Sequence, residues 1–222
     1  MNKYLAELLG TYALVFAGTG AVVIDLETHG SITHVGIAIT FGLIVMSMIY
    51  AFGEISGAHI NPAVSIAFTI AGRFPLKKLP IYICSQITGA TLASLTLKLL
   101  FPANRFLGAT QPGGGEWQSF LLEFLLTFFL MLVIINVSSG SKEQGMFAGV
   151  AIGSIVCLEA MFAGPICGAS MNPARSLGPA IASGHFSSLW IYILAPVTGA
   201  IAAVPVFNML KPELITSSND KI

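Results

Sequence analysis

The chain contains one nine-residue pattern twice, as SGAHINPAV at residues 56–64 and as CGASMNPAR at residues 167–175. Gly, Ala, Asn, Pro and Ala recur in register between the two copies. An Asn followed by Pro predicts the start of a helix, because Asn caps free backbone amides and Pro is tolerated at the first helical position. From Asn61 to Gly72 such a helix has 12 residues and a length of about 18 Å, a little over half of a bilayer core. Each copy therefore predicts a half-helix that enters a membrane without crossing it.

The composition of the 222 residues excludes a soluble protein with a single core. Of these residues 55% are hydrophobic and only 9% are charged, against about 45–50% and about 25% in soluble domains. Ten Lys and Arg balance ten Asp and Glu. Because this balance leaves no overall field that would attract nucleic acid, we expect no nucleic-acid partner and a lipid bilayer as the surroundings.

Stretches that are almost free of charge and near 20 residues long predict membrane-spanning helices. Strand-like alternation is absent from them, so we expect an all-α membrane protein with six transmembrane helices and two re-entrant half-helices. The half-helices belong to residues 55–72 and 165–184, which Gly, Pro and polar residues interrupt. The six predicted spans are residues 5–24, 35–53, 79–98, 117–138, 146–163 and 189–210.

The loops between the predicted spans carry most of their positive charge on one side, which the positive-inside rule places in the cytoplasm. Both termini are then cytoplasmic, since the number of crossings is even. The first half-helix follows two spans and the second follows five, so the two enter from opposite faces and their N-termini meet near the midplane. The cytoplasmic side would hold Lys3, Arg73, Lys77, Lys78, Lys142, Lys211 and Lys221, and the outer side would hold Asp25, Glu27, Arg105 and Glu116.

The two halves of the chain correspond beyond the nine-residue pattern. Gly89 and Gly199 follow the Asn of their own half by 28 and 27 residues, and we expect both to permit close helix crossing. Glu7 and Glu123 precede that Asn by 54 and 49 residues. With three spans in each half, the second copy must be inverted in the membrane, an architecture that places a permeation site at the midplane. The predicted repeats are residues 1–105 and 116–212 of a single membrane channel domain, residues 1–222.

Two facing helix N-termini would concentrate partial positive charge, about half an elementary charge each, and would repel cations and hydronium. The side-chain amides of Asn61 and Asn172 can donate to the oxygen of a passing water or alcohol, which would interrupt a proton-conducting chain of waters. The alternative is that Asn61 and Asn172 serve only as helix caps and do not contact the solute. Non-helical backbone at membrane depth is tolerated only where protein buries it or water lines it, so a water-filled path is implied. The carbonyls expected along this path belong to Gly57, Ala58, His59, Gly168, Ala169 and Ser170.

Three glutamates fall inside predicted spans, where a lipid-facing charge is costly. Glu7 and Glu123 are expected to accept hydrogen bonds from the backbone of the two re-entrant loops and so to hold these loops in shape. Glu159 is expected to turn toward loop backbone as well.

No sequence feature predicts an enzyme, because His-Glu-x-x-His and Gly-x-Ser-x-Gly motifs are absent. We expect no catalytic residue, no metal site and no cofactor. A secondary transporter is the alternative class, since transporters also use inverted repeats and broken helices, but no set of carboxylates at the midplane indicates ion coupling. The cysteines lack metal-ligand spacing and are expected to be core thiols: Cys84, Cys157 and Cys167.

Two Asn-Pro-Ala sequences in inverted three-span halves, the second followed by Arg, resemble the major intrinsic protein family, the aquaporins. The resemblance covers nearly the whole chain. The stretches GEISGAHINPAV, AGRFP and MFAGPICGASMNPARSLGPAI are similar to plant nodulin-type intrinsic proteins and their bacterial aquaglyceroporin-like relatives. The resemblance implies a homotetramer with one pore per subunit, and the short termini, similar to those of bacterial members, imply a bacterial cytoplasmic membrane. The residues that carry it are Asn61, Pro62, Ala63, Asn172, Pro173, Ala174 and Arg175.

In this family a narrow filter beside the Asn-Pro-Ala sequences decides what passes, and the family's offsets place its four positions on Phe41, Ala160, Ala169 and Arg175. Water-selective relatives typically carry His at the position of Ala160. A filter with two alanines would be wide and partly apolar. It would admit water and small uncharged solutes, such as glycerol-like polyols, urea and neutral metalloid hydroxides (arsenous or boric acid), and exclude protons and ions. A strictly water-selective aquaporin is the alternative within the family.

Overall fold

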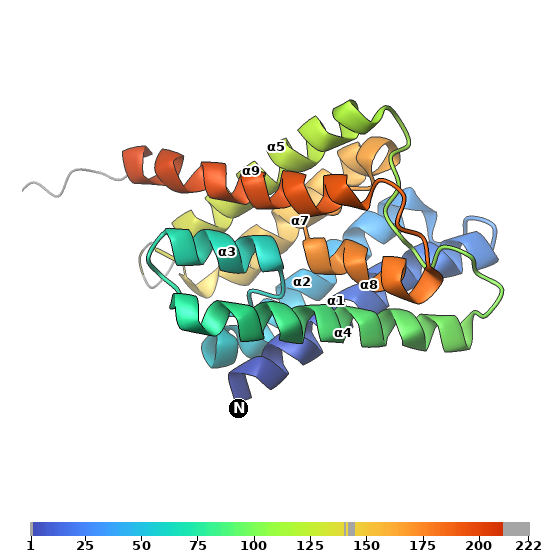
Figure 1. The fold of residues 1–222 in the computed structure, drawn as a ribbon, viewed down its shortest axis with the longest axis horizontal. Coiled ribbons are helices and arrows are strands. Elements are labelled where there is room, and N and C mark those ends of the chain that lie inside the picture. Colours follow the sequence, from blue (N-terminus) through green and yellow to red (C-terminus); the bar gives the residue numbers. More distant parts are fainter. Residues whose placement is uncertain (1, 140, 142–144, 211–222) are drawn as a thin grey trace, which may run out of the picture.

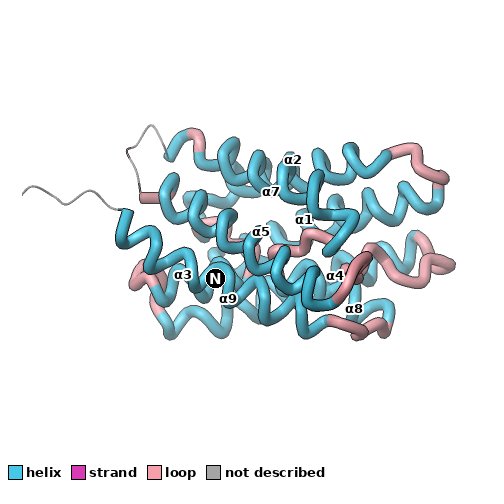
Figure 2. The backbone as a smooth tube through the Cα atoms, turned by 90° about the horizontal axis from the view of Figure 1, so that it is seen from above, coloured by secondary structure: helices cyan, strands magenta, loops and turns pink. Residues whose placement is uncertain are grey.

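The computed structural model describes residues 2–139, 141 and 145–210. Three of the lysines used above for orientation, Lys142, Lys211 and Lys221, lie outside the described residues, as does the predicted end of the second repeat at residues 211–212. Among the described residues there is no strand (Figure 2), and six helices are long and apolar enough to cross a membrane. The predicted all-α membrane fold is therefore confirmed.

The long helices run roughly side by side, and two short helices lie end to end between them (Figure 1). A 3-10 turn, Leu76–Lys78, precedes the third long helix. The long helices are α1 (Asn2–Glu27), α2 (Thr33–Ser56), α4 (Leu79–Leu100), α5 (Glu116–Val137), α7 (Ala148–Cys167) and α9 (Leu189–Leu210); the short ones are α3 (Pro62–Ile70) and α8 (Pro173–Ser183).

The observed helix ends correct several predicted boundaries. Helix α2 continues three residues past the predicted end of its span, to Ser56, and α7 continues four residues past its own, to Cys167. Each ends where the next residue is a glycine with a positive φ, 88° at Gly57 and 84° at Gly168, a conformation that glycine adopts without steric cost. The first half-helix has nine residues instead of the predicted 12, because the chain leaves the helix at Ala71. The fifth span, expected from about residue 146, begins as α7 at Ala148.

Close helix crossing occurs at the same place in both halves. A Cβ atom on Gly89 would overlap the carbonyl oxygen of Leu8, and one on Gly199 would overlap that of Phe124. Helix α4 therefore lies directly against α1, and α9 against α5. The predicted role of the two glycines is confirmed.

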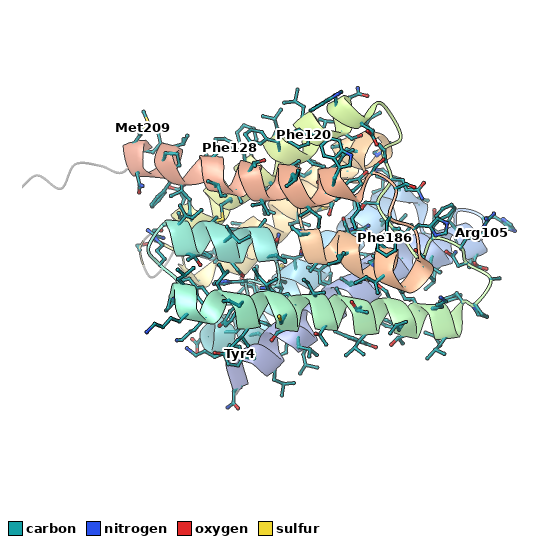
Figure 3. The ribbon with its side chains drawn as sticks, in the orientation of Figure 1. Tyr4, Arg105, Phe120, Phe128, Phe186 and Met209 are labelled. Carbon is teal, nitrogen blue, oxygen red and sulfur yellow. The ribbon has the colours of Figure 1, made fainter. Side chains whose placement is uncertain are left out.

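Each short helix packs on a long helix of the other half, α3 on α9 and α8 on α4. This exchange fixes both short helices in the interior, in line with one another (Figure 1). The side chains that point away from the bundle include many large apolar ones, among them Phe186 and Met209 (Figure 3). Arg105, in the loop after α4, and Met209, near the end of α9, lie at opposite ends of the molecule in the same view.

Candidate functional site

Both short helices begin as the Asn-Pro sequences predict. The Asn61 side chain accepts a hydrogen bond from the Ala63 amide at 2.9 Å, with Pro62 at the first helical position. Asn172 accepts one from the Ala174 amide at 3.0 Å. Each Asn has extended backbone and a side-chain oxygen committed to its own helix. Only the amide nitrogen of each side chain is left to face another group.

The two nitrogens bind across the contact between the halves. Asn61 Nδ2 donates to the carbonyl oxygen of Met171 at 2.8 Å, and Asn172 Nδ2 donates to that of Ile60 at 2.9 Å. The N-termini of α3 and α8 therefore face one another, as the insertion from opposite faces predicts. An amide nitrogen carries two hydrogens, so each Asn keeps a second donor beyond these contacts.

Glu7 is fully buried and holds the loop that leads into α3. Its carboxylate accepts from the backbone amides of His59 and Ile60 at 2.9 and 2.7 Å. It also accepts from Ser56 Oγ at 2.7 Å and from Gln86 Nε2 at 2.8 Å. Four donors from three elements thus converge on one carboxylate inside the membrane.

Glu123 has the same place in the second half. It is fully buried, and its two oxygens accept from the amides of Ser170 and Met171 at 2.7 and 2.8 Å. These amides occupy the positions that His59 and Ile60 have in the first loop. Both carboxylates therefore bind the residues that curve toward their Asn.

A narrow cavity of about 50 Å³ passes the ends of both short helices. Beyond it lies a wide vestibule of about 330 Å³. Four residues line both spaces, and they are the four positions that the family offsets select: Phe41, Ala160, Ala169 and Arg175. Other residues of the narrow cavity include Leu14, Val45, Asn61, Leu130, Ile152 and Asn172, and those of the wide vestibule include Val22, His34, Phe106, Gly108 and Gly168.

Arg175 is only 4% exposed and is held in place by two contacts. Its Nη1 donates to the carbonyl oxygen of Gly108 at 2.7 Å, and its guanidinium carbon lies 5.0 Å from the centre of the Phe41 ring. Its Nε has no hydrogen-bond partner among the residues that the structure describes. A guanidinium carries five donors, so most of them remain for whatever occupies the cavity.

The six predicted carbonyl residues are divided between several places. His59, Ala169 and Ser170 line the narrow cavity, and Gly168 lines the wide vestibule. Gly57 and Ala58 line neither of these two spaces; Gly57 is exposed and Ala58 is buried. The second loop thus contributes more of its predicted residues to the cavity than the first.

Some functional neighbours were missed by sequence reasoning. Gln86 is a polar residue in an apolar stretch, which could have marked it as a partner for Glu7. Gly108 accepts from Arg175 through its backbone carbonyl, so its residue type gives no indication of this contact in the sequence. The partner expected for Glu159 is not found: this side chain is 2% exposed, and its Oε2 accepts no hydrogen bond from the described part of the chain.

The cysteine prediction is only partly right. Cys167 is buried, Cys157 is half-buried and Cys84 is exposed on α4. An apolar stretch predicts burial poorly in a membrane protein, because helix faces that meet lipid are apolar too. Within residues 2–139, 141 and 145–210, no group of three or more His, Cys, Asp or Glu side chains could hold a metal ion.

Six membrane-crossing helices around two half-helices that meet at a narrow cavity define an α-helical membrane channel. The sequence model of the family described as "Major intrinsic protein" matches residues 1–207. The chain is 49% identical over 212 residues to aquaporin NIP1-1 of Zea mays, covering 95% of this chain and 75% of that protein. It is 49% identical over 213 residues to nodulin-26 of Glycine max, covering 95% and 78%. This chain belongs to the major intrinsic protein family.

A solved structure gives the same result for the fold. The X-ray structure of the aquaglyceroporin from Plasmodium falciparum matches with a TM-score of 0.82 and 28% sequence identity. The match covers 94% of this chain and 96% of that chain. The fold of a membrane channel for small molecules therefore extends over nearly the whole sequence.

Proposed function

We propose that this chain is a passive channel for water and small uncharged solutes and that Phe41, Ala160, Ala169 and Arg175 form its filter. The single observation that carries this proposal is that these four residues alone line both the narrow cavity and the wide vestibule, as those two spaces are described above. A solute that moves from one space to the other must pass between them. The names of the relatives, aquaporin, nodulin-26 and aquaglyceroporin, support the same class of solutes.

The chemistry of the four side chains favours small polyols, urea and neutral metalloid hydroxides beside water. Ala160 and Ala169 are small and apolar, so they leave room for a carbon chain and can accept its desolvated face. Arg175 lies against the Phe41 ring and can donate hydrogen bonds to hydroxyl groups. A solute with one apolar and one hydroxyl-bearing side fits such a ring better than an ion, which would lose its hydration shell.

Exclusion of protons and cations is assigned to two places. The facing N-termini of α3 and α8 provide partial positive charge where the narrow cavity passes them, and Arg175 provides a full charge at the filter. Asn61 and Asn172 each retain a donor that can orient a passing water. A chain of waters oriented in this way cannot relay a proton past the two residues.

The wider organisation is proposed with the filter. Residues 1–105 and 116–212 would form two inverted repeats of one channel domain. In support of this, Glu7 and Glu123 make equivalent contacts in their own halves, and so do Gly89 and Gly199. Family membership supports a homotetramer with one pore per subunit, both termini in the cytoplasm and no catalytic activity. The bacterial cytoplasmic membrane stays a prediction of the sequence, because the NIP1-1 and nodulin-26 relatives are plant proteins.

The test is stopped-flow light scattering on proteoliposomes that contain the wild type or Ala160→His. The wild type is expected to shrink quickly in sucrose and to reswell quickly in glycerol. Ala160→His should keep the water flow and lose glycerol flow, because the imidazole narrows the filter and adds a polar group to its apolar wall. Ser154→His is the matched control, since Ser154 is exposed on the same helix and lines neither the narrow cavity nor the wide vestibule. A wild type that passes water alone would overturn the filter proposal.

A further inference from the structure

Helix α7, which carries Ala160, has an interruption in its hydrogen bonds just beyond the filter. Pro165 lies inside this helix and has no backbone N–H. The helical partner of a carbonyl is the N–H four residues later, so the carbonyl of Met161 loses its partner within the helix. Met161 directly follows Ala160. The last turn of α7 is thus weakened where its backbone leads from Ala160 to Ala169.

A side chain from another helix takes the vacant place. His34 Nε2 lies 2.7 Å from the Met161 carbonyl oxygen. A carbonyl only accepts, so Nε2 carries the hydrogen and donates. Gly164 makes room for the ring, because a Cβ atom there would lie 2.8 Å from His34 Cε1. Three residues of α7, namely Met161, Gly164 and Pro165, are therefore arranged to receive one imidazole.

His34 is well placed to act on the filter without entering it. It is the second residue of α2 and lines the wide vestibule. Phe41 follows it by seven residues on the same helix face, about 10 Å along the axis. The bond from His34 to Met161 thus ties the helix of Phe41 to the helix of Ala160 on the vestibule side of both residues.

We infer that His34 is a positioning residue for the filter. It replaces the hydrogen bond that Pro165 removes, and it fixes the distance between Phe41 on one side of the filter and the two alanines, Ala160 and Ala169, on the other. This inference rests on the proposed filter. Without the bond, water can satisfy the Met161 carbonyl in the vestibule, but water does not tie α2 to α7. Phe41 and the two alanines then move apart, and the filter discriminates less between solutes of different size.

The experiment measures the permeability ratio of erythritol to glycerol in proteoliposomes for five channels: wild type, His34→Leu, His34→Gln, Pro165→Ala and the double variant His34→Leu/Pro165→Ala. His34→Leu should raise the ratio at least about threefold, the size of effect expected for one lost hydrogen bond. The same substitution in the Pro165→Ala background should change it by less than about 1.5-fold, because Pro165→Ala restores a backbone N–H that can donate to the Met161 carbonyl. His34→Gln should return the ratio to the wild-type value, since the glutamine amide can donate from a similar position.

Equal effects of His34→Leu in the two backgrounds, or no change in the ratio in either, would overturn the inference while leaving the filter itself standing. A wild type that conducts neither glycerol nor erythritol would instead overturn the proposed function. The amounts of folded protein, measured by size-exclusion chromatography, allow each permeability to be expressed per channel. An equal fall in the erythritol and glycerol permeabilities, which leaves their ratio unchanged, counts against the inference, because a positioning role must alter selectivity.

Discussion

The two half-helices start alike but differ in what surrounds them. Asn61 and Asn172 cap their helices at nearly equal distances, and Glu7 and Glu123 each hold the loop before the cap. Four hydrogen bonds reach Glu7, two of them from the side chains of Ser56 and Gln86. In the second half Cys167 takes the place of Ser56 and its thiol, a weak donor, still hydrogen-bonds Glu123, whereas Pro196 takes the place of Gln86 and has no donor.

The second loop is braced from a different direction. Thr110, in the segment between the halves, donates to Ser176 Oγ at 2.7 Å, and Ser176 lies 2.6 Å from Ser170 Oγ. The residue three positions after the Asn also differs: Val64 in the first half and Arg175 in the second. The comparison teaches that the helix start is the same on both sides of the midplane, whereas the filter proposed above depends on the surroundings of the second half-helix.

The largest difference is expected between the two carboxylates. Glu7→Ala should lower the thermal unfolding midpoint and the water permeability more than Glu123→Ala does, because Glu7 accepts from four donors, whereas Glu123 accepts from two backbone amides and the weak thiol donor of Cys167. The backbone amides of His59 and Ile60 lose the acceptor described for them, at about 1–3 kcal/mol each, and Ser56 and Gln86 keep only their second acceptors, the Phe52 carbonyl and Ser65 Oγ. Unfolding in detergent and stopped-flow scattering measure the two quantities. Glu54→Ala is the control, since Glu54 is an exposed carboxylate of the first half. An equal or greater loss in Glu123→Ala would remove the proposed asymmetry.

The next effect concerns ion exclusion. Arg175→Val gives the second half the residue that the first half has at the equivalent position, Val64. Proton flux should rise about tenfold or more, equivalent to ~1.4 kcal/mol of lost barrier, because only the partial charges of the helix ends then remain. A pH-sensitive dye inside liposomes measures the flux, with Val64→Ala as the matched variant. Unchanged proton flux in Arg175→Val would place the whole barrier at the midplane.

The smallest effect is expected at the hydroxyl brace. Thr110→Val keeps the shape of the side chain and removes the donor to Ser176, at a cost of about 1 kcal/mol. The unfolding midpoint should fall by a few degrees, consistent with about 2–4 °C per kcal/mol in a protein of this size. Thr91→Val is the comparison, because within the described part of the chain Thr91 bonds only to a carbonyl of its own helix, that of Ile87. A shift no larger in Thr110→Val than in Thr91→Val would mean that the brace contributes nothing.

Much of the fold could be predicted from the sequence because its signals are local. Six nearly uncharged stretches of sufficient length predicted the six crossings, and Asn followed by Pro predicted both half-helices. The helix ends were harder, since periodicity does not reveal that Gly57 and Gly168 are the points at which the chain adopts a positive φ. Pro165 indicated that the fifth span ends near residue 163, but α7 continues to Cys167. His34, from a distant part of the chain, binds the Met161 carbonyl that the proline leaves without a helical partner.

The residues of the candidate site could also be predicted from local sequence, whereas the contacts that hold them could not. Offsets from the Asn-Pro-Ala sequences selected four residues that line both the narrow cavity and the wide vestibule: Phe41, Ala160, Ala169 and Arg175. The contacts that hold these four residues join residues far apart in the chain, and some of them, such as the Gly108 carbonyl, involve backbone alone. Neither sequence distance nor residue type indicates such contacts before the chain is folded.

One matched pair of substitutions tests most directly whether the second half determines selectivity. Ala58 and Ala169 each precede their Asn by three residues, are 7% and 8% exposed, and have φ angles of 44° and 41°. Asn tolerates this left-handed conformation, so Ala58→Asn and Ala169→Asn impose comparable strain. The measurement is the glycerol-to-water permeability ratio of each variant in proteoliposomes.

The account predicts that Ala169→Asn lowers this ratio at least about fivefold, equivalent to ~1 kcal/mol, and that Ala58→Asn leaves it within about twofold of the wild type. Equal changes in the two variants, or a larger change in Ala58→Asn, would contradict the claim that the filter belongs to the second half-helix and its neighbours.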